Sequence, residues 1–166
     1  MVNMRRIIIT GVLLAAGIIT SFWFFNSDEA KIKRQFKALA ELVAKDSEEH
    51  QLIAAANARK ISNMFSEISR FEIPSHSISR TYKRDNIQAH VMAVRGRYSA
   101  ISLKFHDLQI SILEEGLAHA NFTAYVELAW DLAEPVREVQ ELICRIEKIE
   151  NDWYIKETEI ISILER

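Results

Sequence analysis

Apolar residues recur along the chain with two different periods, and the period changes near residue 105. Before that point they return every three or four residues, which is the spacing of an amphipathic helix. Three such stripes predict three helices: Ile32, Phe36, Leu39 and Val43 in the first; Ala54, Ala58, Ile61, Phe65 and Ile68 in the second; Ile87, Val91, Val94, Tyr98 and Ile101 in the third. Asp46 followed by Glu49 has the spacing of a capping box and predicts the start of the second helix. A short extended piece around Phe71 and Ile73, ended by Pro74, separates the second helix from the third.

After residue 105 apolar and polar residues alternate, which is the period of a β-strand with one buried face. The apolar positions are Leu108, Ile110 and Ile112 in one strand, Ala118, Ala120, Phe122, Ala124, Val126, Leu128 and Trp130 in the next, and Leu142, Cys144 and Ile146 in a third. Gly116 marks the first turn, and residues 150–152 form a hairpin turn into a last strand that ends near Leu164. Helices followed by antiparallel strands predict an α+β domain whose helices cover one face of the sheet.

The opposite face of this predicted sheet is amphipathic rather than purely polar. Thr123, Tyr125, Ile143 and Arg145 lie on it among charged residues. A face of this kind is either solvated or covered by a partner. We therefore expect these four residues to form an interface, either in a homodimer or with another protein of the cell envelope.

This order of elements resembles the nuclear transport factor 2-like (NTF2-like) superfamily, which includes the SnoaL-like and cystatin-like cones. The resemblance covers about residues 28–164. Its most specific pieces are the last hairpin, RIEKIENDWYIKETEI, and the central hairpin, LQISILEEGLAHANFTAYVEL. Asn151 stands where the family often has glycine, so a positive φ is expected there. The resemblance implies three N-terminal helices on a curved antiparallel sheet, with a pocket at the wide end of the cone. It implies no single activity, because this fold hosts enzymes, transport factors and scaffolds.

A long uncharged segment, IIITGVLLAAGIITSFWFF, occupies residues 7–25. A helix of this length crosses the roughly 30 Å hydrocarbon layer of a bilayer. The sequence therefore predicts one transmembrane helix, with a membrane anchor over residues 1–27 and the domain over residues 28–166. A cleaved secretory signal is the alternative, but bulky Phe22 to Phe25 occupy the place of a small-residue cleavage site. A buried helix of a soluble protein is disfavoured, because no face of the segment is polar.

Lys and Arg residues flank both ends of this segment, so the positive-inside rule does not give one answer. Arg5 and Arg6 lie directly before the segment, whereas Asp28 and Glu29 come first after it. This order favours a cytoplasmic N-terminus. We expect a single-pass protein of a bacterial-type inner membrane with a periplasmic C-terminal domain. Cys144 is the one cysteine, so it says nothing about the redox compartment.

The charge balance argues against nucleic acid as a partner. The whole chain has a net charge of −2 from 21 basic and 23 acidic residues. Arg5 and Arg6 precede the domain, which leaves it 19 basic residues and a net charge of −4. Nucleic-acid binding depends on cationic contacts to phosphates. The five histidines lack the spacing of a metal site, so we expect neither a metal nor a cofactor.

Few residues are candidates for chemistry inside the cone. His106 shares the phase of Leu108 and Ile110 and is expected to point inward, with Tyr98 one helix away. These two would be the acid–base and hydrogen-bonding groups of an enzyme. Tyr82 precedes the third helix and is expected to line the mouth of the same ligand pocket. No second inward carboxylate accompanies them, so the sequence leans away from catalysis.

Together these features favour a membrane-anchored, non-catalytic binding or scaffold module that self-associates through its outer sheet face. The same architecture, one membrane span ahead of a cone, resembles the inner-membrane scaffold component of type IV secretion systems. Two alternatives stay open. One is an isomerase-like or hydrolase-like enzyme that uses His106 and Tyr98. The other is a carrier that holds a hydrophobic small molecule in the cone.

Overall fold

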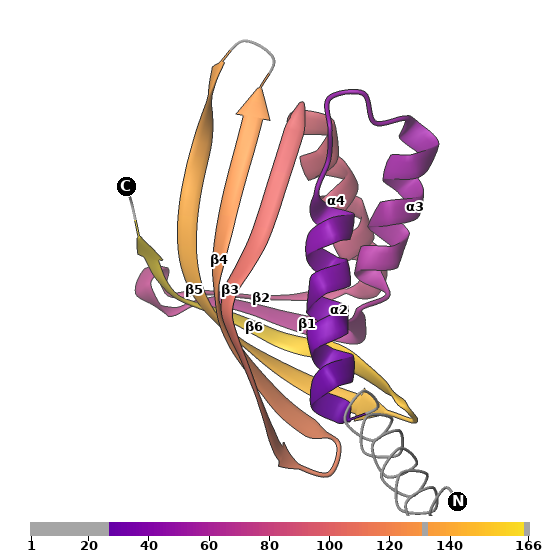
Figure 1. Cartoon of the computed structure of the whole chain (residues 1–166), viewed down its shortest axis with the longest axis vertical. Helices are drawn as coiled ribbons and strands as arrows, with labels where there is room; N and C mark the ends of the chain where they lie inside the picture. The colour runs from indigo at the N-terminus through magenta and orange to yellow at the C-terminus, as the bar shows by residue number, and fades with distance from the viewer. Residues whose placement is uncertain (1–26, 131–132, 165–166) are drawn as a thin grey trace, which may run out of the picture.

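The structure, a computed structural model, describes residues 27–130 and 133–164. In chain order its elements are α2 (Asp28–Val43), α3 (Gln51–Ser62), β1 (Phe65–Ile73), the 3-10 turn η1 (Pro74–His76), β2 (Ile78–Lys83), α4 (Arg84–Arg97), β3 (Ala100–Glu114), β4 (Leu117–Trp130), β5 (Ala133–Ile149) and β6 (Asp152–Leu164). The strands form one sheet in the order β2-β1-β6-β5-β4-β3. Figure 1 shows this sheet strongly curved, with the three helices on its concave side. The expected α+β cone is confirmed.

Helix α2 supplies the centre of the hydrophobic core. Its predicted stripe is confirmed, since Ile32 and Phe36 are fully buried and Leu39 is nearly so. The ring of Phe36 meets Phe105 of β3 and Phe122 of β4 edge-on, with centroids 5.6 and 5.1 Å away. The last two rings lie 4.8 Å from each other. Edge-to-face aromatic packing of this kind stabilises a core beyond simple burial.

The second predicted helix is shorter than its apolar spacing indicates. Helix α3 ends at Ser62, and Phe65 and Ile68 lie in β1. Phe65 pairs with Ile155 of β6, so strand pairing outweighs the local helical spacing. A three-to-four-residue spacing that continues across a turn is indistinguishable from a longer helix in the sequence alone.

The capping box predicted at Asp46 is also wrong. Helix α3 begins at Gln51, and its cap is His50, whose Nδ1 accepts a hydrogen bond from the backbone N–H of Leu52 at 3.3 Å. Glu49 does not fold back on the helix start. Its carboxylate is turned toward Arg95 of α4, with which it forms an ion pair. Glu49 therefore forms a long-range ion pair instead of the predicted local capping hydrogen bond.

The C-terminal ends of α2 and α4 stabilise each other. Arg95, whose side chain is 3% exposed, donates hydrogen bonds of 2.9 to 3.3 Å to the carbonyl oxygens of residues 42–44. In return, Lys45 Nζ donates to the carbonyl oxygens of Arg95 and Tyr98, both at 2.6 Å. The last carbonyls of a helix have no partner within it and carry partial negative charge. Arg95 of α4 thus places a cation at the end of α2, and Lys45, two residues after α2, places one at the end of α4.

The third predicted helix ends before two residues of its predicted stripe. Tyr98 follows the last residue of α4 in an extended conformation, and Ile101 lies in β3. The backbone of Ile101 exchanges two hydrogen bonds with Lys45, of 2.9 and 3.0 Å. This bridge extends the sheet by one residue beside its edge strand.

The resemblance implied a wholly antiparallel sheet, but the observed sheet is mixed. Strand β1 pairs with β6 in parallel, and its other neighbour, β2, is antiparallel to it. Strands β3 to β6 form the expected antiparallel meander. In the β5–β6 turn the positive φ, 58°, belongs to Glu150 and not to Asn151. The turn therefore has the predicted place, but its left-handed residue comes one position earlier.

A bulge in β3 changes which residues face the helices. Asp107 has a φ of 55°, and the pairing with β4 shifts between His106 and Gln109. Phe105 packs against the core before the bulge, and Leu108 does so after it. His106 is consequently exposed and opposite Thr123 on the outer face. This corrects its expected inward orientation, because an extra residue reverses the alternation.

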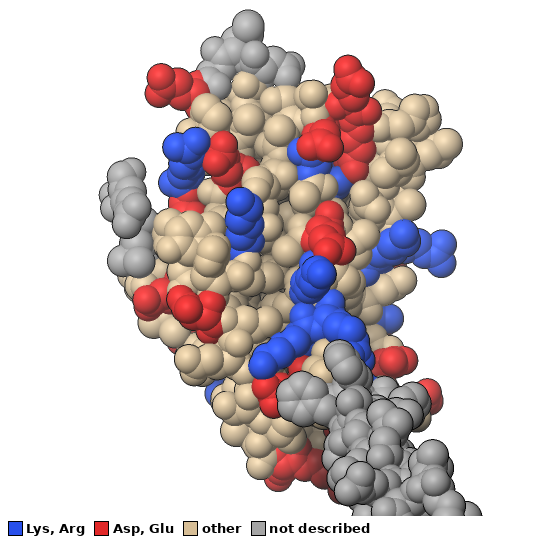
Figure 2. Space-filling model, viewed as in Figure 1, with Lys and Arg blue, Asp and Glu red and all other residues tan. Residues whose placement is uncertain are grey.

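The predicted membrane anchor over residues 7–25 lies outside the described residues. Within the described residues, no helix combines the length and the apolar character that crossing a bilayer requires. Figure 2 shows acidic and basic side chains interspersed over one face of the domain, with Lys and Arg gathered along α2.

Candidate functional site

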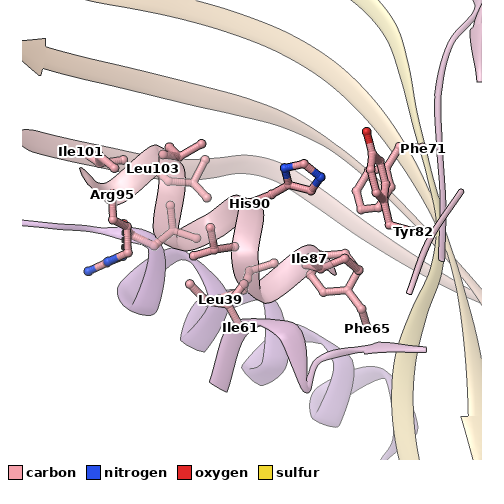
Figure 3. Close-up of a pocket in the computed structure, with 13 residues that line it drawn as sticks. Leu39, Ile61, Phe65, Phe71, Tyr82, Ile87, His90, Arg95, Ile101 and Leu103 are labelled. Carbon is pink, nitrogen blue, oxygen red and sulfur yellow. Dashed lines mark hydrogen bonds between the residues drawn. The ribbon is translucent and has the colours of Figure 1, made fainter. Parts of the chain in front are cut away.

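An apolar cavity of about 390 Å³ opens between the helices and the β1–β3 part of the structure (Figure 3). It is lined by Leu39, Val43, Ile61, Phe65, Phe71, Tyr82, Ile87, His90, Val91, Val94, Arg95, Ile101 and Leu103. Leu39 and Val43 come from the C-terminal half of α2, whereas the rings of Phe65 and Phe71 come from β1. The cone is therefore hollow at this end, as the predicted pocket requires.

Tyr82 and His90 are the polar pair of this cavity. Their rings meet edge-on with centroids 4.9 Å apart, and Phe71 lies 5.7 Å from Tyr82 on the other side. Figure 3 shows the imidazole of His90 directed from α4 toward Tyr82 and Phe71. Of the three residues predicted to line a ligand pocket, Tyr82 lines this cavity. In the sequence, His90 lies one position before Val91 of the apolar stripe. That position predicts a residue at the edge of the buried face and gives no sign of a place in the cavity lining.

Arg95 is the third polar residue in the lining, but its charge is directed elsewhere. Figure 3 shows its guanidinium pointing away from the other lining residues. The group is bound by Glu49 and by three backbone carbonyls at the end of α2. Its alkyl part contributes an apolar wall. The sequence did not indicate this role, because Glu49 and Arg95 are far apart in the chain.

The structure does not bring His106 and Tyr98 together with Tyr82. His106 packs its ring against Tyr125 on the outer face, with centroids 4.6 Å apart. Tyr98 lies beyond the end of α4, and its ring contacts that of Trp130 at a tilt, with centroids 4.9 Å apart. Neither residue lines the apolar cavity. The two side chains are thus separated by the sheet and by different aromatic neighbours.

The four residues predicted as an interface share one face of the sheet. Thr123 and Tyr125 lie on β4, and their partners in the register alternate with the core residues of β5. Ile143 and Arg145 lie on that same side of β5. Tyr125 has 44% of its surface exposed, which is high for an aromatic residue in the middle of a strand. The mixed character of this face is therefore real, and its partner stays a prediction.

Cys144 is part of the core and not a nucleophile. It is buried on β5, and burial raises the pKa of its thiol to about 12, although a contact with Thr158 Oγ1 opposes the shift. A thiol with such a pKa is protonated near neutral pH and reacts slowly. Across residues 27–130 and 133–164, no group of three His, Cys, Asp or Glu side chains is arranged to hold a metal ion.

No protein-family model and no curated protein matches the sequence. Solved structures do match it in shape. A candidate aromatic ring hydroxylase from Novosphingobium aromaticivorans superposes with a TM-score of 0.66 at 12% identity, over 82% of this chain and 92% of that one. An NTF2-like protein with a cystatin-like fold from the same species gives 0.59 at 13% identity, over 89% and 86%.

A third similar structure is the hexachlorocyclohexane dehydrochlorinase LinA-type3 from Novosphingobium barchaimii. It superposes with a TM-score of 0.59 at 8% identity, over 81% of this chain and 87% of that one. Identities this low show a shared fold and carry no residue roles. The described domain has the NTF2-like α+β fold.

Proposed function

We propose that this chain is a membrane-tethered NTF2-like domain that binds a small apolar molecule in its cone cavity. The observation that carries the proposal is the cavity lining, in which ten of the thirteen side chains are aliphatic or phenylalanine. Cavities of about 300–1,000 Å³ with this character hold small-molecule ligands. Transfer of apolar surface from water into such a space is favourable by about 25 cal/mol per Å².

Tyr82 and His90 determine which polar group the ligand needs. Tyr82 offers a phenolic hydroxyl and His90 an imidazole nitrogen at the same side of the cavity. One hydrogen-bonding group on an otherwise apolar molecule satisfies both side chains. The tether is the uncharged segment at residues 7–25, which supports the proposal as a property of the sequence.

Catalysis is not part of this proposal, although two of the similar structures carry enzyme names. The thirteen lining residues include no carboxylate, cysteine or serine. Tyr82 and His90 alone offer no partner to fix the tautomer or the basicity of the imidazole. The binding function needs nothing beyond the groups that line the cavity.

Native mass spectrometry of the full chain, released from membranes in detergent, tests the binding function. We expect an apolar adduct on the unaltered protein and a roughly tenfold lower occupancy in Val91→Phe, whose larger ring fills the cavity. Leu52→Phe is the matched control, because Leu52 is 75% exposed on α3 and outside the lining. Equal occupancy in both variants would contradict the proposal.

Self-association through the outer sheet face is a second candidate function, favoured by the exposed Tyr125. This ring contacts that of His106 beside charged residues, and exposed aromatic residues are typical of interfaces. Tyr125→Asp combined with Ile143→Asp should convert an oligomer to a monomer in sedimentation of the full chain in detergent. Val136→Asp, on the opposite face, is the control. An unchanged sedimentation coefficient in the double variant would exclude this candidate.

A further inference from the structure

Two hairpin turns lie side by side at the end of the domain where α2 begins. The β3–β4 turn contains Gly116, whose carbonyl oxygen accepts a 2.8 Å hydrogen bond from the backbone N–H of Lys148 near the β5–β6 turn. Figure 1 shows both turns next to the first residues of α2. The N-terminal side of the domain is thus formed by three chain segments that are distant in sequence.

Side-chain contacts fix the start of α2 to this end. Asp28 accepts hydrogen bonds from Lys148 Nζ at 3.0 and 3.1 Å and from Trp153 Nε1 at 3.1 Å. Burial opposes the ionisation of Asp28, but these hydrogen bonds and the charges of Lys148 and Lys31 outweigh it, so its pKa lies below the ordinary value. The direction from which the chain reaches the domain is therefore set by the β5–β6 hairpin.

Four exposed aliphatic side chains lie at the strand ends beside these two turns. Ile112, Leu113 and Leu117 around the first turn have 45%, 57% and 39% of their surfaces exposed, and Ile149 at the second has 48%. Turns normally carry polar residues, because their backbone is solvated. The four large aliphatic residues beside these adjacent turns therefore expose apolar area to water.

The length of chain before α2 identifies what covers this surface. Phe25 ends the uncharged segment, and only Asn26 and Ser27 separate it from Asp28. Three peptide units span at most about 11 Å when fully extended. If residues 7–25 cross a bilayer, Asp28 lies within that distance of its surface, and Lys148 and Trp153, which bind Asp28, bring the β5–β6 turn to the same end of the domain.

We infer that the apolar turn surface, Ile112, Leu113, Leu117 and Ile149, rests in the interfacial layer of the bilayer that anchors the chain. Aliphatic side chains on a domain surface bind that layer by burying apolar area near the headgroups. Glu114 and Glu115 lie between Leu113 and Leu117, and they keep the turn at headgroup depth. This inference rests on the proposed tether, but it is independent of the cavity ligand.

Fluorescence of a labelled cysteine in the full chain, reconstituted in phosphatidylcholine nanodiscs, tests the inference. An environment-sensitive nitrobenzoxadiazole label is placed at Leu113→Cys or Ile149→Cys, while the buried Cys144 stays unlabelled because its pKa is about 12. The control is Leu52→Cys on α3, where the side chain is 75% exposed. Spin-labelled lipids with the nitroxide near the headgroup should reduce emission about twofold at the two turn positions and leave position 52 unchanged.

The possible outcomes separate the inference from the tether. A chain that does not stay with the nanodiscs overturns both the tether and this inference. A chain that stays, with equal and water-like emission at positions 113 and 52, overturns the inference alone. Blue-shifted emission at position 113 without quenching by the spin-labelled lipids also overturns it, because protein rather than lipid then covers the turns.

Discussion

The two halves of helix α2 face the same sheet and yet border a solid core on one side and a cavity on the other. In the packed half, Ile32 and Phe36 are fully buried, and the ring of Phe36 meets those of Phe105 and Phe122. In the hollow half, Leu39 and Val43 line the cavity of about 390 Å³. The apolar stripe is continuous through both halves, so the difference does not arise from the helix.

The difference arises from the residues opposite each half. Two aromatic rings approach Phe36 from neighbouring strands, whereas the hollow half faces branched aliphatic residues of α4 such as Val91 and Val94. Arg95 and Lys45 hold the ends of α2 and α4 together at that end without filling the space between them. A cone can therefore stay open where polar contacts, rather than packing, fix the distance between its walls.

The largest expected effect breaks the packed half. Phe36→Ala removes the ring that joins α2 to β3 and β4, and it should lower the free energy of unfolding by about 3–5 kcal/mol. Val43→Ala in the hollow half should cost only about 1 kcal/mol, because it enlarges an existing space. Urea unfolding followed by circular dichroism compares the two variants. Similar losses would show that the two halves do not differ in packing.

A second expected effect concerns the polar contacts that hold the hollow half. Arg95→Ala leaves the Glu49 carboxylate buried without its cation, which costs about 3–5 kcal/mol in comparable buried pairs. The exposed Arg97 on the same helix gives the control, Arg97→Ala, with a change below about 0.5 kcal/mol. If the Arg95 variant unfolds at the same urea concentration as the control, the ion pair does not stabilise this end.

Adding volume should distinguish the two halves in a third way. Ala120→Leu places three extra carbon atoms in a fully buried position of the core and should cost about 1–3 kcal/mol. Val91→Phe fills the cavity and should change the free energy of unfolding by less than about 1 kcal/mol. Both values come from the same unfolding experiment. An equal cost for the two substitutions would indicate that the cavity walls cannot accept a ring.

The smallest expected effect is a pH dependence at the start of α2. The pKa of Asp28 is lower in the folded protein than in the unfolded chain, whose value is near 3.8. Its contribution is therefore complete above pH 3.8 and is lost as the pH falls through the folded-state value. Asp28→Asn should flatten the loss of stability that begins below about pH 4. A variant with the same pH profile as the unaltered protein would contradict this assignment.

Periodicity alone predicted most of the fold and little of the site. The stripe of α2 and the alternation from Ala118 to Ala124 follow directly from burial, so they are visible in the sequence. The bulge at Asp107 is not visible, because a single left-handed residue inside a strand leaves the composition of that strand unchanged. Because the prediction assumed regular alternation through this position, it placed His106 on the inner face of the sheet instead of the outer one.

The cavity residues show the same limit. Tyr82 was expected at a pocket mouth from its place before α4, and it does line the cavity. His90 carries no such signal, because its role depends on a ring contact with Tyr82 that arises only when β2 folds against α4. The ion pair between Glu49 and Arg95 also cannot be predicted from local sequence, because the two residues are far apart in the chain. Long-range partners decide these positions.

The length of helix α2 sets the distance between the start of the domain and the cavity. Its 16 residues cover about 24 Å, and Leu39 lies eleven residues beyond the point where the chain reaches the domain. If the proposed anchor precedes α2, the cavity lies up to about 16 Å farther from the bilayer than the first residue of the helix. On that proposal, an occupant exchanges with the aqueous side rather than with the surrounding leaflet.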